Sequence, residues 1–323
     1  MTTSGVGRPR RSPRCFIRPL APEPPAWVRE LFATRLLPVT ERRGAIEVIR
    51  RDPFARVTGR IPGAAHLDAT ELSSQVAAEY VAISRVLQSL DRHPIRFWNY
   101  VPGIVDPLDR GLDRYMAFNR GRHLAYTDLH GSPNGFARAL PTASAVGITG
   151  PDLVIDCLAS DEPGTPVENP RQTASWRYSR VYGPRPPCFA RGTLTSIDGR
   201  RVLLVGGTAS IVGEESRHLA NRAAQVEEVL ANMEALIANA AAERPADSSR
   251  VSRKGLARLT DARIYVVDAD DAGSVEEEIQ SRVGRSVRFE TVVARVCRPE
   301  LLVEIEGVAS MADDSPGAAA AAL

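Results

Sequence analysis

The chain has 323 residues, of which 43% are hydrophobic and 25% are charged, a composition typical of a soluble globular protein with one large or two medium domains. Its net charge of +2 indicates no broad attraction to nucleic acid or to membranes, and no stretch approaches the ~20 apolar residues that span a bilayer. These features exclude most nucleic-acid-binding and membrane-embedded classes of protein.

Cysteine and histidine usage gives no sign of a metal site. The four cysteines form no Cys-x-x-Cys pair, and the five histidines form no His-Glu-x-x-His or similar ligand spacing. The basic N-terminus has no hydrophobic segment behind it, so it is not a secretory signal. We therefore expect no metal, reduced thiols and a cytoplasmic location.

In the first half of the chain, the tail at residues 1–15 is rich in Arg, Pro, Ser and Gly and is expected to be disordered. An apolar stripe at steps of four and three predicts a helix over residues 71–90, and Pro94 ends it. The aromatic run 95–103 predicts a strand that ends in a turn. A second helix is expected over residues 108–126.

Polar residues stand among the leucines on the predicted inward stripe of this second helix, which is Leu108, Leu112, Tyr115, Asn119 and Arg122. Tyr115 and Arg122 are seven positions apart, which is two helical turns, so they share one face. An arginine there either serves a buried site or extends its charged group to the edge of the domain, and the pattern alone leaves both interpretations open.

Beyond residue 150 the pattern predicts a mixed sheet. The expected elements are a buried strand at 153–158, a polar loop at 167–187, a hairpin of 189–197 and 201–212 around Asp198-Gly199, helices at 216–242 and 274–283, and strands at 263–267, 288–297 and 301–308. This order predicts an α+β fold with both helices on one face of the sheet. The linker 246–254 and the tail 310–323 are expected to lie outside it.

The last predicted strand places carboxyl groups among aliphatic side chains. Because side chains alternate along a strand, Glu304 and Glu306 share one face. A carboxyl group in an apolar site has a raised pKa, so it keeps a proton at neutral pH and can donate it. The alternative is an edge strand with two solvated glutamates, and this segment by itself favours that alternative.

Several motifs, in order along the chain, carry a resemblance to a known family. Residues 189–309 resemble the RidA (YjgF) fold, through the hairpin that leads to LLVGG (203–207), the helix with Gln225 and Asn232, and the final LVEIE (302–306). The chain also contains FWNYVPG (97–103), LDRYMAFNRGR (112–122), ENPRQ (168–172), YGPRPP (182–187) and GTASIVG (207–213). Together these motifs resemble the chorismatase family. The sequence thus predicts an N-terminal α+β domain at 16–148 and a RidA-like C-terminal domain at 149–309.

The resemblance implies removal of the enolpyruvyl group of chorismate as pyruvate, without a metal or organic cofactor. It implies that Glu304 is the acid/base residue and that four others bind the substrate between the two domains: Tyr115, Arg122, Tyr178 and Arg191. The chemistry agrees, because arginines bind carboxylates, of which chorismate has two, and an enol ether breaks once its methylene carbon is protonated. We expect a monomer with chorismate as its only partner.

The identity of the second product depends on two positions. Cys297 resembles the cysteine of family members that make 3-hydroxybenzoate, whereas Ala209 resembles the hydrolytic members that leave a dihydroxycyclohexadiene carboxylate. We favour 3-hydroxybenzoate. Two other functions stay open, a RidA-like imine or enamine hydrolase and a non-catalytic module that binds a small metabolite. The additional N-terminal half argues against the first of these, because it would require a compact trimer with sites between subunits.

Overall fold

The computed structural model describes residues 19–33, 38–131, 133–242, 255–283 and 286–311. Most of the predicted tails and the linker 246–254 lie outside these residues. Ser310 is described and ends the last strand, so the C-terminal tail begins later than predicted. Within the described residues, no helix is long and apolar enough to cross a membrane.

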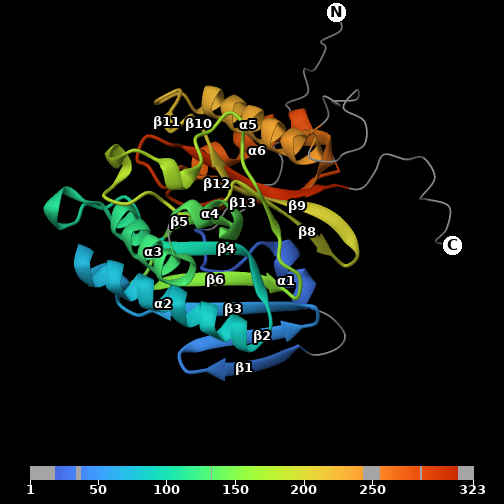
Figure 1. The fold of residues 1–323 in the computed structure, drawn as a ribbon. Helices are drawn as coiled ribbons and strands as arrows, with labels where there is room; N and C mark the ends of the chain where they lie inside the picture. Colours follow the sequence, from blue (N-terminus) through green and yellow to red (C-terminus); the bar gives the residue numbers. More distant parts are fainter. Residues whose placement is uncertain (1–18, 34–37, 132, 243–254, 284–285, 312–323) are drawn as a thin grey trace, which may run out of the picture.

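The N-terminal half forms a six-stranded sheet in the order β1-β2-β3-β6-β4-β5 (Figure 1). Only β4 and β5 are parallel, and all other neighbours are antiparallel. The strands are β1 (Val39–Arg43), β2 (Ile46–Arg51), β3 (Phe54–Ile61), β4 (His93–Pro102), β5 (Thr142–Ile148) and β6 (Leu153–Ser160). The sequence analysis predicted β4 and β6 but not β1, β2, β3 or β5.

The C-terminal half forms a second six-stranded sheet in the order β13-β12-β14-β9-β8-β7. Here only β12 and β13 are parallel. The strands are β7 (Thr165–Val167), β8 (Gly192–Ile197), β9 (Arg200–Ala209), β12 (Leu259–Val266), β13 (Arg288–Val293) and β14 (Val303–Ser310). The predicted turn joins β8 to β9, where Asp198 and Gly199 both have positive φ (48° and 74°).

The two halves share one topology. In each, three antiparallel strands are followed by a helix, a strand, a second helix and two strands, and the last strand inserts between the third and the fourth. β6 does so in the first sheet and β14 in the second. The sequence analysis assigned this arrangement to residues 149–309 alone and put β6 with them. In the structure β6 is hydrogen-bonded to β3 and β4, so the sheets divide between β6 and β7, while the division into two domains stays a prediction.

The longer helices cover the outer faces of the two sheets (Figure 1). Side chains of α2 and α3 pack on the first sheet, and those of α5 and α6 pack on one face of the second, as predicted. A third apolar cluster joins the inner faces of the two sheets. The helices are α1 (Ala26–Phe32), α2 (Ala69–Ser89), α3 (Arg114–His130), α4 (Pro133–Ala139), α5 (Arg222–Ala242) and α6 (Ala272–Val283).

Local chemistry sets where the helices begin. Asp68 caps α2 through the backbone N–H groups of Thr70 and Glu71, and Glu71 reciprocates in a capping box. The helix predicted over 108–126 begins only at Arg114, because the Asp113 side chain accepts the Met116 N–H and acts as the N-cap. The preceding residues form the short 3-10 helix η2 (Asp109–Gly111), in which Arg110 and Gly111 have positive φ. Similarly, α5 begins six residues later than predicted.

Candidate functional site

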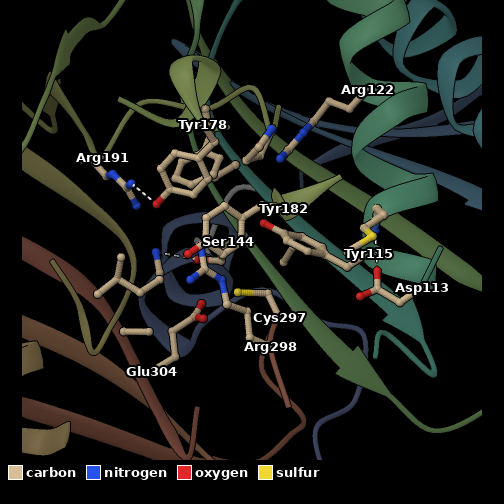
Figure 2. A pocket seen from close by; sticks show the side chains of 18 residues that line it. Asp113, Tyr115, Arg122, Ser144, Tyr178, Tyr182, Arg191, Cys297, Arg298 and Glu304 are labelled. Carbon is tan, nitrogen blue, oxygen red and sulfur yellow. Dashed lines mark hydrogen bonds between the residues drawn. The ribbon is translucent and has the colours of Figure 1, made fainter. Parts of the chain in front are cut away.

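One pocket opens between the two halves, and it includes about 750 Å³ of space when its mouth is counted. Its walls come from the start of α3, from β5, β9 and β14, and from the segment that precedes β8 (Figure 2). It is lined by Asp113, Tyr115, Met116, Arg122, Ala143, Ser144, Ala145, Tyr178, Tyr182, Pro187, Phe189, Arg191, Gly207, Ala209, Ile211, Cys297, Arg298 and Glu304. Apolar and aromatic side chains with a few polar groups among them are the usual lining of a small-molecule site.

Glu304 lies on β14 at the floor of this pocket and is only 4% exposed. Its side chain crosses Gly207 so closely that a Cβ at position 207 would collide with Oε1. Burial first, and then the charge of neighbouring Glu306, raises the pKa of the Glu304 carboxyl from 4.5 to about 8, while Arg96 and Arg191 oppose the shift. Glu304 therefore carries a proton at neutral pH.

Arg122 projects into the pocket from α3 and is 1% exposed. It donates a hydrogen bond of 2.8 Å to Asn119 Oδ1, and its Nε has no partner among the described residues. The guanidinium lies over the rings of Phe118 and Phe189, at 5.1 and 5.5 Å from their centroids. Its position on the inward face of α3 shows that it does not extend to solvent.

Arg191 stands directly before β8 and is also buried. It donates to the Tyr178 hydroxyl at 2.7 Å and to the Thr173 carbonyl at 3.0 Å, and its Nε again has no described partner. Its guanidinium lies 5.1 Å from the centroid of the Phe189 ring, so both arginines flank the same aromatic side chain. Neither guanidinium forms an ion pair with a described carboxylate, although Glu168 accepts the Arg191 backbone N–H at 3.3 Å and its charge acts on the Arg191 guanidinium. Two such buried cations make a pocket suited to an anionic ligand.

Cys297 and Ala209 lie close to Glu304. Ala209 on β9 is the residue directly opposite Glu304 in the antiparallel ladder. Burial, followed by the charge of Glu304, raises the pKa of Cys297 to about 12, so its side chain is a neutral thiol. These two residues border the space above the carboxyl group.

The seven residues predicted as a site line this one pocket: Tyr115, Arg122, Tyr178, Arg191, Ala209, Cys297 and Glu304. These residues are far apart in the sequence, from α3 to β14, and the packing of one half on the other brings them together. Figure 2 shows Tyr115 and Arg122 on the α3 side and Glu304 with Cys297 on the opposite side. The roles of these residues in binding and chemistry stay predictions.

Four polar lining residues were missed by the sequence analysis: Asp113, Ser144, Tyr182 and Arg298. Arg298 donates to Glu214 O and Ser216 Oγ, and its guanidinium lies 3.9 Å from the centroid of the Tyr182 ring. Arg298 follows Cys297 directly, and Asp113 and Tyr182 stand inside the motifs quoted above. The place of these three residues in the sequence could therefore have identified them as candidates. Ser144, in a run of small residues, gave none.

Metal binding finds no support in the described part of the chain, where no cluster of at least three His, Cys, Asp or Glu side chains could hold an ion.

Comparisons with known proteins give one consistent family. Residues 30–159 match the family model for the N-terminal part of FkbO/Hyg5-like chorismatases. A 3-hydroxybenzoate synthase of Streptomyces hygroscopicus is 31% identical over 237 residues, which cover 72% of this chain and 68% of that protein. A chorismatase of Streptomyces rapamycinicus is 34% identical over 246 residues, 72% of this chain and 69% of that one. A crystal structure of a chorismatase superposes with a TM-score of 0.74 at 27% identity and covers 84% of this chain and 80% of its own.

The raised pKa of Glu304 predicts a pH-dependent stability. An unfolded glutamate loses its proton near pH 4.5, whereas folded Glu304 holds it to about pH 8, so the folded state loses stability as pH rises through this window. In Glu304→Gln that loss is absent. The free energy of unfolding of the variant minus that of the parent should therefore grow by up to about 1.4 kcal/mol per pH unit. Urea unfolding of both proteins at several pH values measures it, and parallel curves would contradict a protonated Glu304.

Proposed function

Since the chain belongs to the chorismatase family, we propose that it cleaves chorismate and releases pyruvate in the pocket around Glu304. The observation that carries this proposal is a carboxyl group with a pKa raised to about 8 beside two buried arginines, neither of whose guanidinium groups forms an ion pair with a described carboxylate. Chorismate brings the matching groups, which are two carboxylates and an acid-labile enol ether.

Binding would rest on the two arginines. Each guanidinium has an unpartnered Nε–H and is already held by hydrogen bonds and by the Phe189 ring, so little side-chain entropy remains to be lost on binding. A dianionic ligand would replace the missing counter-ions of Arg122 and Arg191 and remove the cost of burying unpaired charge. Tyr115 and Tyr178 would complete the polar contacts, and Ala209 would border the ring.

The chemical step would begin with transfer of the Glu304 proton to the methylene carbon of the enol ether. This leaves an oxocarbenium-like cation, and the new carboxylate of Glu304 stabilises it electrostatically in a site largely closed to water. Hydrolysis then adds one water to the cation and returns its proton to Glu304. Formation of 3-hydroxybenzoate consumes no water, because pyruvate and 3-hydroxybenzoate together have the composition of chorismate. In both routes the carboxyl group is regenerated.

We favour 3-hydroxybenzoate as the second product. The support is the neutral thiol of Cys297 in the pocket next to Glu304, together with the likeness to a 3-hydroxybenzoate synthase. Ala209 stands directly opposite Glu304 on the neighbouring strand and would border the same intermediate. A monomer in the cytoplasm stays our expectation.

Incubation with chorismate tests the proposed function. We expect pyruvate to appear without added metal or nucleotide and after exhaustive chelation, and Glu304→Gln to lower turnover by roughly 10²–10⁴ because a positioned general acid is lost. Chromatography of the products follows both. Hydrolysis of imines in place of chorismate cleavage would support a RidA-like enzyme. Tight binding of chorismate without turnover would support a binding module. Near-parent turnover in Glu304→Gln would remove this residue from the chemistry.

Substitution of the arginines tests the binding mode. Arg122→Ala and Arg191→Ala should each weaken chorismate binding by about 2–5 kcal/mol, since each leaves a carboxylate of the ligand without its buried partner. Lysine at either position should restore part of the loss, because it keeps the charge but not the planar fork. Titration calorimetry in the Glu304→Gln background measures the affinity without turnover. Arg282→Ala, on the exposed face of α6, is the matched control. Affinity equal to that control would exclude both residues from binding.

The last test of this reaction concerns Cys297. If its thiol steers the cation, Cys297→Ala should change the ratio of 3-hydroxybenzoate to the non-aromatic hydrolysis product and affect pyruvate release less. Protonation by Glu304 comes before this partition, so the two readouts separate. A packing role would cost about 1 kcal/mol of stability and leave the ratio unchanged. Quantifying both products for parent and variant distinguishes these outcomes.

A further inference from the structure

Two carboxyl groups of β14 share a face of the strand but differ in their partners. Glu304 and Glu306 are 4% and 2% exposed. Glu306 accepts hydrogen bonds from Arg96 Nη2 at 2.7 Å, Trp98 Nε1 at 2.8 Å and Ser144 Oγ at 2.5 Å. The Glu304 carboxyl lines the pocket and accepts none from the described residues. The donors therefore stabilise negative charge on Glu306, whereas Glu304 receives no such hydrogen bond and has the raised pKa.

The donors of Glu306 form a rigid network that joins both sheets. Arg96 on β4 also donates to Ser144 Oγ at 2.6 Å, and its guanidinium lies 5.0 Å from the centroid of the Trp98 ring. The same hydroxyl of Ser144 accepts the Gly207 N–H at 2.9 Å, directly beneath the Glu304 side chain. The network thus holds the charged carboxylate at a set place below the candidate acid.

We propose that Glu306 is a positioning residue, whose fixed negative charge acts through Glu304 and keeps the proton on that neighbouring carboxyl. The inference rests on the proposed role of Glu304 as the acid. Two carboxylates so close in a buried site repel each other, so only one ionises readily, and the three hydrogen bonds determine which one. Without this charge, the acid would lose its proton at a lower pH and would be inactive over more of the neutral range.

Groups from several elements face Glu304, and their signs decide the direction of the effect. Burial and Glu306 raise its pKa, whereas Arg96 and Arg191 lower it. Loss of the charge at position 306 removes one raising effect and leaves Arg96 without its carboxylate partner. Both changes lower the pKa of Glu304. Glu304 is faced by Glu306 on β14, Arg96 on β4, Ser144 on β5, Tyr115 on α3, Arg191 before β8 and Cys297 before β14. Arg263 and Tyr265 on β12 and Tyr100 on β4 interact with Glu306 and stay in place in the variants below.

Glu306→Gln tests the inference because it keeps the size of the side chain and removes its charge. In the parent, kcat/KM should fall as pH rises through the pKa of Glu304, since the acid loses its proton. In the variant this alkaline limb should move to lower pH by about one unit or more. Trp98→Phe is the matched control, because it removes one donor and leaves the charge in place. The alkaline limb of kcat/KM in Trp98→Phe should stay within about a few tenths of a pH unit of the parent's limb.

A second readout does not depend on activity. The pH dependence of the free energy of unfolding reports the pKa of Glu304, so the window of stability loss should also end at lower pH in Glu306→Gln. Suppose that neither the alkaline limb of kcat/KM nor the pH window of stability loss moves in Glu306→Gln, while Glu304→Gln is inactive. That result overturns the role of Glu306 and leaves the proposed function standing. An active Glu304→Gln instead rejects the proposed function, and the unfolding curves still decide whether Glu306 acts on Glu304.

Should Glu306→Gln not fold, carbon-13 NMR of the parent labelled at glutamate carboxyls decides the question. The signal that disappears in Glu304→Gln should titrate near pH 8, and it should not be the signal displaced in Trp98→Phe, which marks Glu306. The reverse assignment would overturn the inference.

Discussion

The site depends on the burial of two carboxyl groups two residues apart on β14, in a place where water cannot solvate both charges. Such a pair is stable only if one member receives enough hydrogen bonds to stay ionised and the other keeps its proton. Arg96, Trp98 and Ser144 supply those bonds to Glu306. Under the proposed function, acid chemistry at neutral pH would follow from this unequal hydrogen bonding along one strand.

The repeated topology is what brings these groups together. Because the last strand of each half inserts into the middle of its sheet, β14 is covered on one face by α5 and meets the first sheet on the other. Polar side chains of β4 and β5 therefore reach β14 across the seam between the halves. The same seam buries the guanidinium groups of Arg122 and Arg191 without an ion pair to a described carboxylate, a cost that an anionic ligand would offset.

Local features were predictable from the sequence, and contacts between distant segments were not. The stripe of α2 and the Asp198-Gly199 turn were predicted, because both are set by neighbouring residues. The start of α3 was placed too early, since the Asp113 cap competes with an apolar pattern that continues before it. β5 was not predicted because small residues dominate it, and Ser144 on this strand was therefore not identified either. The family motifs identified the residues that line the pocket, but not the partners of Glu306, which lie some 160 to 210 positions away.

The central claim, that Glu304 carries a proton at neutral pH, can be measured directly by infrared difference spectroscopy. Spectra of the parent minus Glu304→Gln isolate the carboxyl group of this residue. We expect the band of a protonated carboxylic acid at pH 7, replaced by carboxylate bands as pH rises through about 8. Carboxylate bands already present at pH 6, with no acid band, would contradict it.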